Sequence, residues 1–143
     1  MQARAGIIGG VIGGIIKLIL DQLTFAIGIS SVNTAGEFSL LLFRSTRSNF
    51  AIWIVYLLVT GLIGWLLASL IPDVKSYMTV GIAVGVILWI LMNFIFMASG
   101  IVSPTWSMGI GGFIVNLITH AVLGISITYA IWRLRERART TAR

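Results

Sequence analysis

The stretch Gly6–Gly28, GIIGGVIGGIIKLILDQLTFAIG, is an apolar run that is long enough to cross a bilayer. A transmembrane helix needs roughly 20 predominantly apolar residues. The run also contains two opposite charges, Lys17 and Asp21, which a helix brings onto one face one turn apart. A single charge near the middle of a span costs about 2.5–3.5 kcal/mol on insertion scales. We therefore expect the charged face to point into protein rather than into lipid.

Two ladders of glycine precede the charged pair in this stretch. Small residues at every fourth position let a second helix approach closely inside a membrane. Similar spacing recurs in the later apolar parts of the chain. We predict that helices pack through these glycines: Gly6, Gly9, Gly10, Gly13, Gly14, Gly64, Gly81, Gly85 and Gly124.

The composition agrees with a membrane protein of one domain. Of the 143 residues, 58% are hydrophobic and only 10% are charged. The chain has no cysteine, which excludes disulfides, thiolate metal sites and cysteine nucleophiles. Its net charge of +6 could indicate nucleic-acid binding, but five of the ten basic residues lie in the last eleven positions. That placement is typical of a topology signal, so we expect no nucleic-acid partner.

Four apolar segments predict an all-α integral membrane protein. A capping-box pattern from Thr34 to Glu37 begins the long first connection and predicts a short helix at the membrane interface. A re-entrant gate is the alternative for this segment. The residues 72–75 read as a tight turn. The expected segments are spans at about 5–28, 50–71, 77–99 and 109–132, an interfacial segment at 35–47 and a basic tail at 133–143.

The distribution of basic residues predicts the orientation. Four spans put both termini on one side of the membrane, and that side contains seven basic residues against two on the other. Positive charge marks the cytoplasmic side, so we expect both termini in the cytoplasm. The tail from Arg133 could serve as a topology anchor or bind anionic headgroups.

The spans also suggest an internal repeat. Shifting the third span onto the first by 72 residues, and the fourth onto the second by 60, aligns glycine with glycine. The aligned pairs include Gly9 with Gly81, Gly13 with Gly85, and Gly64 with Gly124. The pattern predicts two similar helical hairpins related by a pseudo-two-fold axis along the membrane normal.

The polar residues of the spans fall at two depths. We predict a buried polar network with an inner layer near mid-span and an outer layer one turn further out. The inner layer comprises Lys17, Thr60, Trp89 and His120. The outer layer comprises Asp21, Tyr56, Asn93 and Asn116, and we expect Asp21, Asn93 and Asn116 to form one cluster. Trp89 could also stack on the Lys17 ammonium.

Ionisable residues inside a membrane are candidates for function. Lys17, Asp21 and His120 together could pass protons or gate an ion, or they could form a structural network that fixes the register of the helices. A haem would need a second axial ligand such as Met92 beside the single histidine, and a zinc site lacks ligands. We expect no catalytic residue, no metal and no cofactor.

Three short motifs carry a resemblance to a known group. They are Gly9-Gly10-x-x-Gly13 with Lys17, Gly81-x-x-x-Gly85-x-x-x-Trp89, and His120-x-x-x-Gly124. In these motifs the chain resembles uncharacterised bacterial four-span membrane proteins, the YqhR-like and YagU-like proteins. The YagU-like proteins look to have His-x-x-x-Gly in the second span, where this chain has Thr60 before Gly64. The resemblance implies a bacterial inner-membrane protein and carries no activity.

Two functions follow as hypotheses. The first is a component of an oligomeric channel or permease in which Lys17, Asp21 and His120 line or gate a polar path. The second is a non-catalytic scaffold or accessory subunit that docks partner helices through its glycine faces. The expected partners are the lipid bilayer and either further copies of the chain or another membrane protein. The sequence names no substrate.

Overall fold

The computed structural model describes residues 2–31, 33–45, 47, 50–71 and 76–141. The predicted turn at 72–75 and the end of the tail at Arg143 lie outside these residues. The described residues form helices and no strand. The helices are α1 (Gln2–Ala26), α2 (Thr34–Phe43), α3 (Phe50–Leu70), α4 (Tyr77–Ser99), the short 3₁₀ helix η1 (Thr105–Ser107) and α5 (Gly109–Thr141).

Four of these helices, α1, α3, α4 and α5, are long and apolar enough to cross a membrane, so the predicted all-α membrane fold is confirmed. Their outward faces carry many exposed large apolar side chains, such as Ile12, Leu58 and Phe94. Lipid is the medium that makes such a surface favourable. Some boundaries differ from the prediction. The helix α1 covers Gln2–Ala26 rather than 5–28, and α2 covers Thr34–Phe43 rather than 35–47. The largest difference is that α5 continues as a single helix to Thr141 and includes most of the basic tail.

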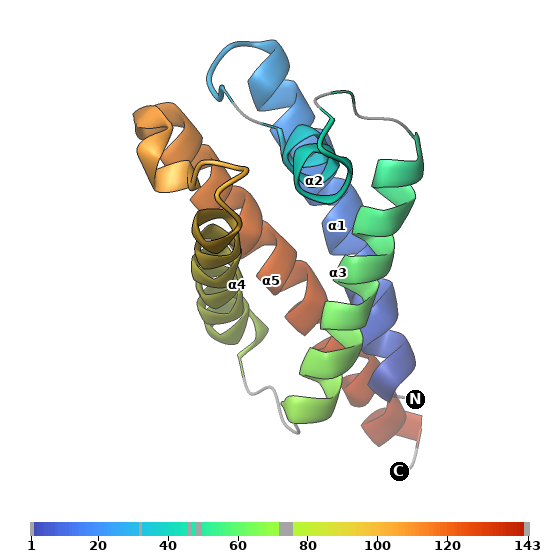
Figure 1. Ribbon diagram of the computed structural model, residues 1–143. Helices are drawn as coiled ribbons and strands as arrows, with labels where there is room; N and C mark the ends of the chain where they lie inside the picture. The colour runs from blue at the N-terminus through green and yellow to red at the C-terminus, as the bar shows by residue number, and fades with distance from the viewer. Residues whose placement is uncertain (1, 32, 46, 48–49, 72–75, 142–143) are drawn as a thin grey trace.

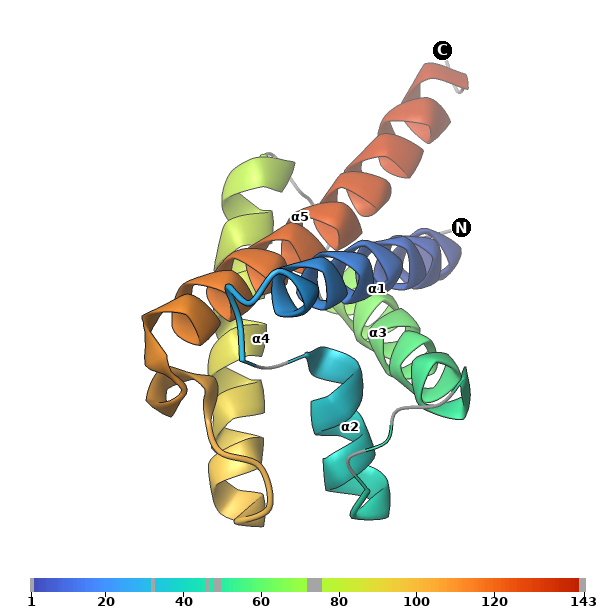
Figure 2. The ribbon, with the colours of Figure 1, turned by 90° about the horizontal axis from the view of Figure 1, so that it is seen from above.

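The helix α1 is central to the arrangement. It packs along α3 on one side and along α5 on the other, and α4 packs on α5 (Figures 1 and 2). Within the described residues, α3 and α4 do not pack along each other, so the bundle stays open on that side. The two ends of the chain lie at the same end of the molecule, as an even number of spans requires (Figure 1).

The two glycine ladders of α1 face different helices. A Cβ added at Gly6 or Gly10 would overlap the backbone of α3 at Gly64 or Thr60. A Cβ at Gly9 would instead meet Ala130 and the backbone of α5, and Gly13 lies against the same helix. The missing side chains therefore allow α1 to approach both neighbours closely. The two ladders thus pack on two different helices, which their spacing alone does not show.

The contact between α4 and α5 has the same character. Gly124 lies against the backbone at Gly81 and Gly85, much as Gly64 lies against Gly6 and Gly10. These contacts relate Gly6 to Gly81, a shift of 75 residues (81 minus 6) rather than the 72 that we used to align the spans. The packing thus moves the register of the predicted repeat by three residues, and the repeat itself stays a prediction.

The helix α2 begins differently from its predicted capping box. Its N-cap is Asn33, whose side chain accepts a hydrogen bond of 2.6 Å from the backbone N–H of Gly36. Because Asn33 caps the helix, the side chains of Thr34 and Glu37 do not serve as caps, and both are buried. The helix ends at Phe43 and is followed by its C-cap Arg44, which has a left-handed backbone with φ of 54°. Its first turn packs into the bundle, and both the interfacial and the re-entrant alternatives for this segment stay predictions.

Candidate functional site

Lys17 is the centre of a buried polar cluster, here called the lysine cluster (Lys17, Asp21, Thr34 and Thr119). The ammonium donates to Asp21 Oδ2 at 2.5 Å, to Thr34 Oγ1 at 3.0 Å and to Thr119 Oγ1 at 3.1 Å. Its three N–H groups thus each have an acceptor. Lys17 is 1% and Asp21 2% exposed, so the predicted pair of charges is indeed buried in protein.

Two threonines of this cluster were missed in the sequence analysis. Thr34 donates to Asp21 Oδ2 while it accepts from Lys17, and Thr119 donates to the carbonyl of Asn116. Thr34 comes from the first turn of α2, although its partners lie well inside α1. Asp21 precedes the end of α1 by five residues, or about 7.5 Å of helix. Hydroxyl side chains are common in membrane helices, so only the fold shows that these two threonines form hydrogen bonds with the charged pair.

A second polar cluster, here called the Asn93 cluster (Trp89, Asn93 and Thr105), joins α4 to η1. The Asn93 amide oxygen accepts from the backbone N–H of Thr105 at 2.5 Å and from its hydroxyl at 2.9 Å. The Trp89 indole donates to the same hydroxyl at 3.0 Å, and the Asn93 NH₂ donates to the Trp89 carbonyl at 2.8 Å. Asn93 therefore fixes the connection into α5.

The predicted outer cluster of Asp21, Asn93 and Asn116 does not form. Asp21 bonds within the lysine cluster and Asn93 bonds to Thr105, so the two layers separate into two clusters. Asn116 is buried and contributes its carbonyl, which accepts from His120 Nδ1 at 2.8 Å. Trp89 packs edge-on against Trp106 and Phe113 rather than over the Lys17 ammonium. The loop residue Thr105 competes successfully for Asn93, and the span sequences alone cannot show this.

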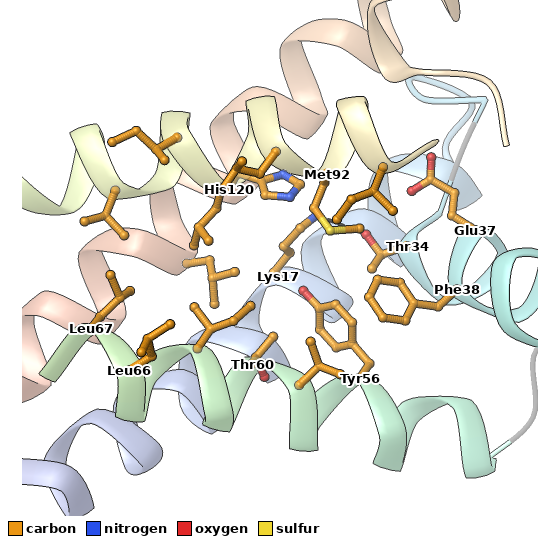
Figure 3. A pocket seen from close by; sticks show the side chains of 18 of the residues that line it. Lys17, Thr34, Glu37, Phe38, Tyr56, Thr60, Leu66, Leu67, Met92 and His120 are labelled. Atoms are coloured by element: carbon orange, nitrogen blue, oxygen red, sulfur yellow. Dashed lines mark hydrogen bonds between the residues drawn. The ribbon is translucent and has the colours of Figure 1, made fainter. Parts of the chain in front are cut away.

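A groove occupies the open side of the bundle between α3 and α4. Its volume is about 410 Å³, and residues of α1, α2, α3, α4 and α5 line its wall (Figure 3). Its polar end receives side chains of the lysine cluster and its neighbours. These are Lys17 from α1, Thr34 and Glu37 from α2, Tyr56 and Thr60 from α3, and His120 from α5. Four of the predicted network residues, Lys17, Tyr56, Thr60 and His120, thus share one cavity.

The rest of the groove is apolar and opens towards lipid. Ile63, Leu67 and Leu123 lie along it towards the C-terminal end of α3, and Leu70 marks that end. From Tyr56 to Leu70 the helix rises about 21 Å, which is most of a bilayer's hydrocarbon thickness. The rim consists of side chains that are about half exposed or more: Leu66, Leu70, Ile87, Leu91 and Ile95.

Among the described residues, three buried polar atoms near the polar end have no hydrogen-bond partner. They are Asp21 Oδ1, Glu37 Oε1 and the Tyr56 hydroxyl. Unpaired polar atoms are costly when buried, so an additional polar contact at this end, to water or to another group, would be stabilising. Tyr56 and Glu37 both line the groove, and Tyr56 points towards Lys17 in Figure 3.

Glu37 lines the site, although its spacing from Thr34 in the sequence predicted a capping role for it. It is 7% exposed and lies in α2, outside the four spans. Burial raises the pKa of its carboxyl to about 8, while the positive charge of Lys17 lowers this pKa and the negative charge of Asp21 raises it. The carboxyl is therefore largely protonated at neutral pH. A glutamate inside an apolar 10-residue helix was the available signal.

The site contains donors and acceptors for hydrogen bonds but no ligand set for a metal. Among the described residues, no three His, Asp or Glu side chains lie together in a way that could hold an ion. His120 donates from Nδ1 to its own helix, which leaves Nε2 as an acceptor. The arrangement is thus suited to binding a molecule with a long apolar part and a small polar end.

Comparison with known proteins adds no family. No protein-family model, curated protein or solved structure matches the chain. The class of protein rests on the chain itself, which forms a small multi-pass membrane protein with four helices long enough to span a bilayer.

Proposed function

We propose that the protein is a small permease component that takes a single-chain hydrophobic or amphiphilic molecule from the bilayer. The molecule enters sideways between α3 and α4 and places its polar end at the lysine cluster. The observation that carries this proposal is the groove itself, which opens towards lipid along α3 and ends at buried polar groups. A water-filled channel for polar solutes does not require an opening towards lipid.

The size of the groove supports a small ligand rather than a partner helix. Small-molecule pockets measure about 300–1,000 Å³, and this groove measures about 410 Å³. A helix about 10 Å wide and as long as the groove occupies roughly 1,600 Å³. One extended chain is the occupant that suits both the length and the volume.

The two alternatives from the sequence find less support. An ion path needs polar groups along its length, but the half of the groove that lies towards Leu70 is lined by apolar side chains such as Ile63 and Leu67. A scaffold that docks partners through glycine faces needs those faces to be free. The faces of Gly6, Gly9 and Gly81 are instead occupied by α3 and α5 of the same chain.

A photocrosslinking experiment tests the proposal. The protein in bilayer nanodiscs is irradiated with a single-chain alcohol that bears a photoreactive diazirine, and mass spectrometry locates the label. We expect labelling of α3 and α4 at the groove, and its loss in Met92→Trp, whose indole fills the cavity at a residue that lines it. Met97→Trp is the matched control, since Met97 is on α4, 53% exposed and outside the groove. Equal labelling of both variants would refute the proposal.

For location, we propose the bacterial inner membrane with both termini in the cytoplasm. The support is the excess of arginine close to the two ends of the sequence, including Arg4, Arg133 and Arg137. Positive residues near span ends are retained on the cytoplasmic side.

A further inference from the structure

Glu37 occupies an unusual position for a carboxyl group. It lines the groove from α2, is almost fully buried, and has an Oε1 atom with no hydrogen-bond partner among the described residues. Its charge is not needed to satisfy Lys17, because Asp21 already pairs with that ammonium at 2.5 Å. A buried acid is costly to keep without a partner, so an additional contact at Oε1 would stabilise it.

The other charged and titratable groups around the groove leave Glu37 as the unmatched one. From α1 come Lys17 and Asp21, which pair with each other. From α3 comes Tyr56, and from α5 comes His120, while the groove residues of α4 are apolar. The ammonium of Lys17 has three acceptors and none of its N–H groups remains for a ligand. An anionic head group would thus meet no available cation.

We infer that the ligand carries a positively charged amine or ammonium head group and that Glu37 is its counter-charge. This inference rests on the proposed function, because it specifies the polar end of the chain-like molecule that the groove binds. The apolar part lies along α3 and α4 towards Leu70, and the head group lies at the polar end of the groove, which Glu37 and Lys17 both line.

An aromatic pair that lines the same groove as Glu37 agrees with a cationic head group. Phe38 and Tyr56 both line the groove, and their rings meet edge to face with centroids 5.0 Å apart. Aromatic rings attract ammonium groups, more strongly when water is excluded. The Tyr56 hydroxyl, which has no hydrogen-bond partner within the part of the chain that the structure describes, is available to an additional polar atom of the head group.

Binding of a cation is then linked to release of a proton. The pKa of Glu37 is raised to about 8, so at neutral pH a bound cation must displace the proton from the carboxyl. Affinity therefore rises with pH up to about 8 and levels off above it. The expected change approaches tenfold per pH unit well below the pKa and is roughly 50-fold between pH 6 and pH 8, where half of the carboxyl is ionised.

The test compares three probes with one chain length and different head groups: decyltrimethylammonium, decanol and decyl sulfate. The charges of the first and last do not change with pH. Binding to the protein in neutral-lipid nanodiscs is measured by calorimetry against empty nanodiscs. We expect decyltrimethylammonium to bind at least about tenfold more tightly than decanol at pH 8.5, with decyl sulfate the weakest.

Variants of Glu37 identify the counter-charge. Glu37→Gln imitates the protonated acid, so it should fold, lose the preference for the cation and show no change of affinity with pH. Glu37→Asp keeps the charge and should keep the preference. Glu136→Gln is the matched control, because Glu136 is exposed on the far end of α5. An unchanged preference in Glu37→Gln would overturn the inference.

The outcomes separate this inference from the proposed function. If all three probes bind alike and Met92→Trp abolishes binding, the groove function stands and the cationic head group is refuted. If Met92→Trp binds every probe as well as the unaltered protein does, both proposals fail.

Discussion

Replacing Lys17 by methionine removes the cation of the lysine cluster while keeping a similar volume. Three hydrogen bonds are lost at once, and Asp21, which is 2% exposed, keeps its charge with only Thr34 as a partner. Breaking a buried ion pair from one side costs about 3–5 kcal/mol. Asp21→Leu strands the ammonium of Lys17 in the same way and should cost a similar amount.

The double variant Lys17→Met/Asp21→Leu should cost far less than the sum of about 6–10 kcal/mol. It leaves no buried charge, and Thr119 keeps its bond to the carbonyl of Asn116. Thr34 loses both of its partners, which costs about 1–3 kcal/mol for one unsatisfied hydroxyl. Changing Thr34 to valine in the same chain should recover most of that remainder.

Unfolding of the purified protein in mixed micelles with increasing dodecyl sulfate measures these free energies. The four chains of the cycle give a coupling energy, which we expect to be at least about 3 kcal/mol. If the two single losses instead add up in the double variant, Lys17 and Asp21 do not depend on each other and the lysine cluster is not the unit described above.

Three further predictions concern packing, protonation and orientation. Gly10→Leu should destabilise the protein by several kcal/mol more than Ile12→Leu in the same unfolding assay, because Gly10 contacts the α3 backbone and Ile12 is 50% exposed; equal losses would contradict the packing. Burial raises the pKa of Glu37 from 4.5 to about 8, so between these pH values the folded chain holds a proton that the unfolded chain has released. The unfolding free energy should therefore fall by about 1.4 kcal/mol per pH unit as pH rises through this range. Glu37→Gln should flatten this slope, and a slope that persists in the variant would contradict the raised pKa. A reporter that is active only in the cytoplasm, fused after Arg143, should be active, and an inactive fusion in a correctly inserted protein would invert the orientation.

The sequence alone was sufficient for the spans and for the burial of the charged pair. Apolar length identifies a membrane helix, and a lysine with an aspartate at i+4 is expensive unless protein covers it. The sequence also identified the glycines as packing residues. It did not show that Gly6 and Gly9 face different helices, because this depends on α1 lying between α3 and α5.

The partners of the polar residues were the part that sequence could not predict. Depth in a span places Asp21 and Asn93 at a similar height, but their hydrogen bonds go to Thr34 and Thr105, which come from connecting segments. The loops enter the bundle and compete for the polar atoms. Glu37 was read as a capping residue because of its spacing from Thr34, whereas the preceding Asn33 caps the helix.

The register of the suggested repeat shows how easily apolar sequences align. A shift of 72 residues matched Gly9 with Gly81, while the contacts match Gly6 with Gly81. With the shift of 75, Lys17 corresponds to Met92, and both residues line the groove. The first hairpin thus has a charged residue, Lys17, where the second has a flexible apolar side chain, Met92. At this position of the repeat, only the first hairpin contributes a polar side chain to the groove.

The position of α1 between α3 and α5 has a consequence for how the protein is made. While the chain is being made, α1 has half of its packing surface reserved for α5, which follows about a hundred residues later. Until α5 is inserted, the face of Gly9 and Gly13 is open to lipid and, among the described helices, α4 has no helix to pack on. Contacts between distant segments form slowly. Assembly of the bundle of α1, α3, α4 and α5 is therefore completed by α5, and chains that stop short of α5 expose the glycine face to other membrane helices.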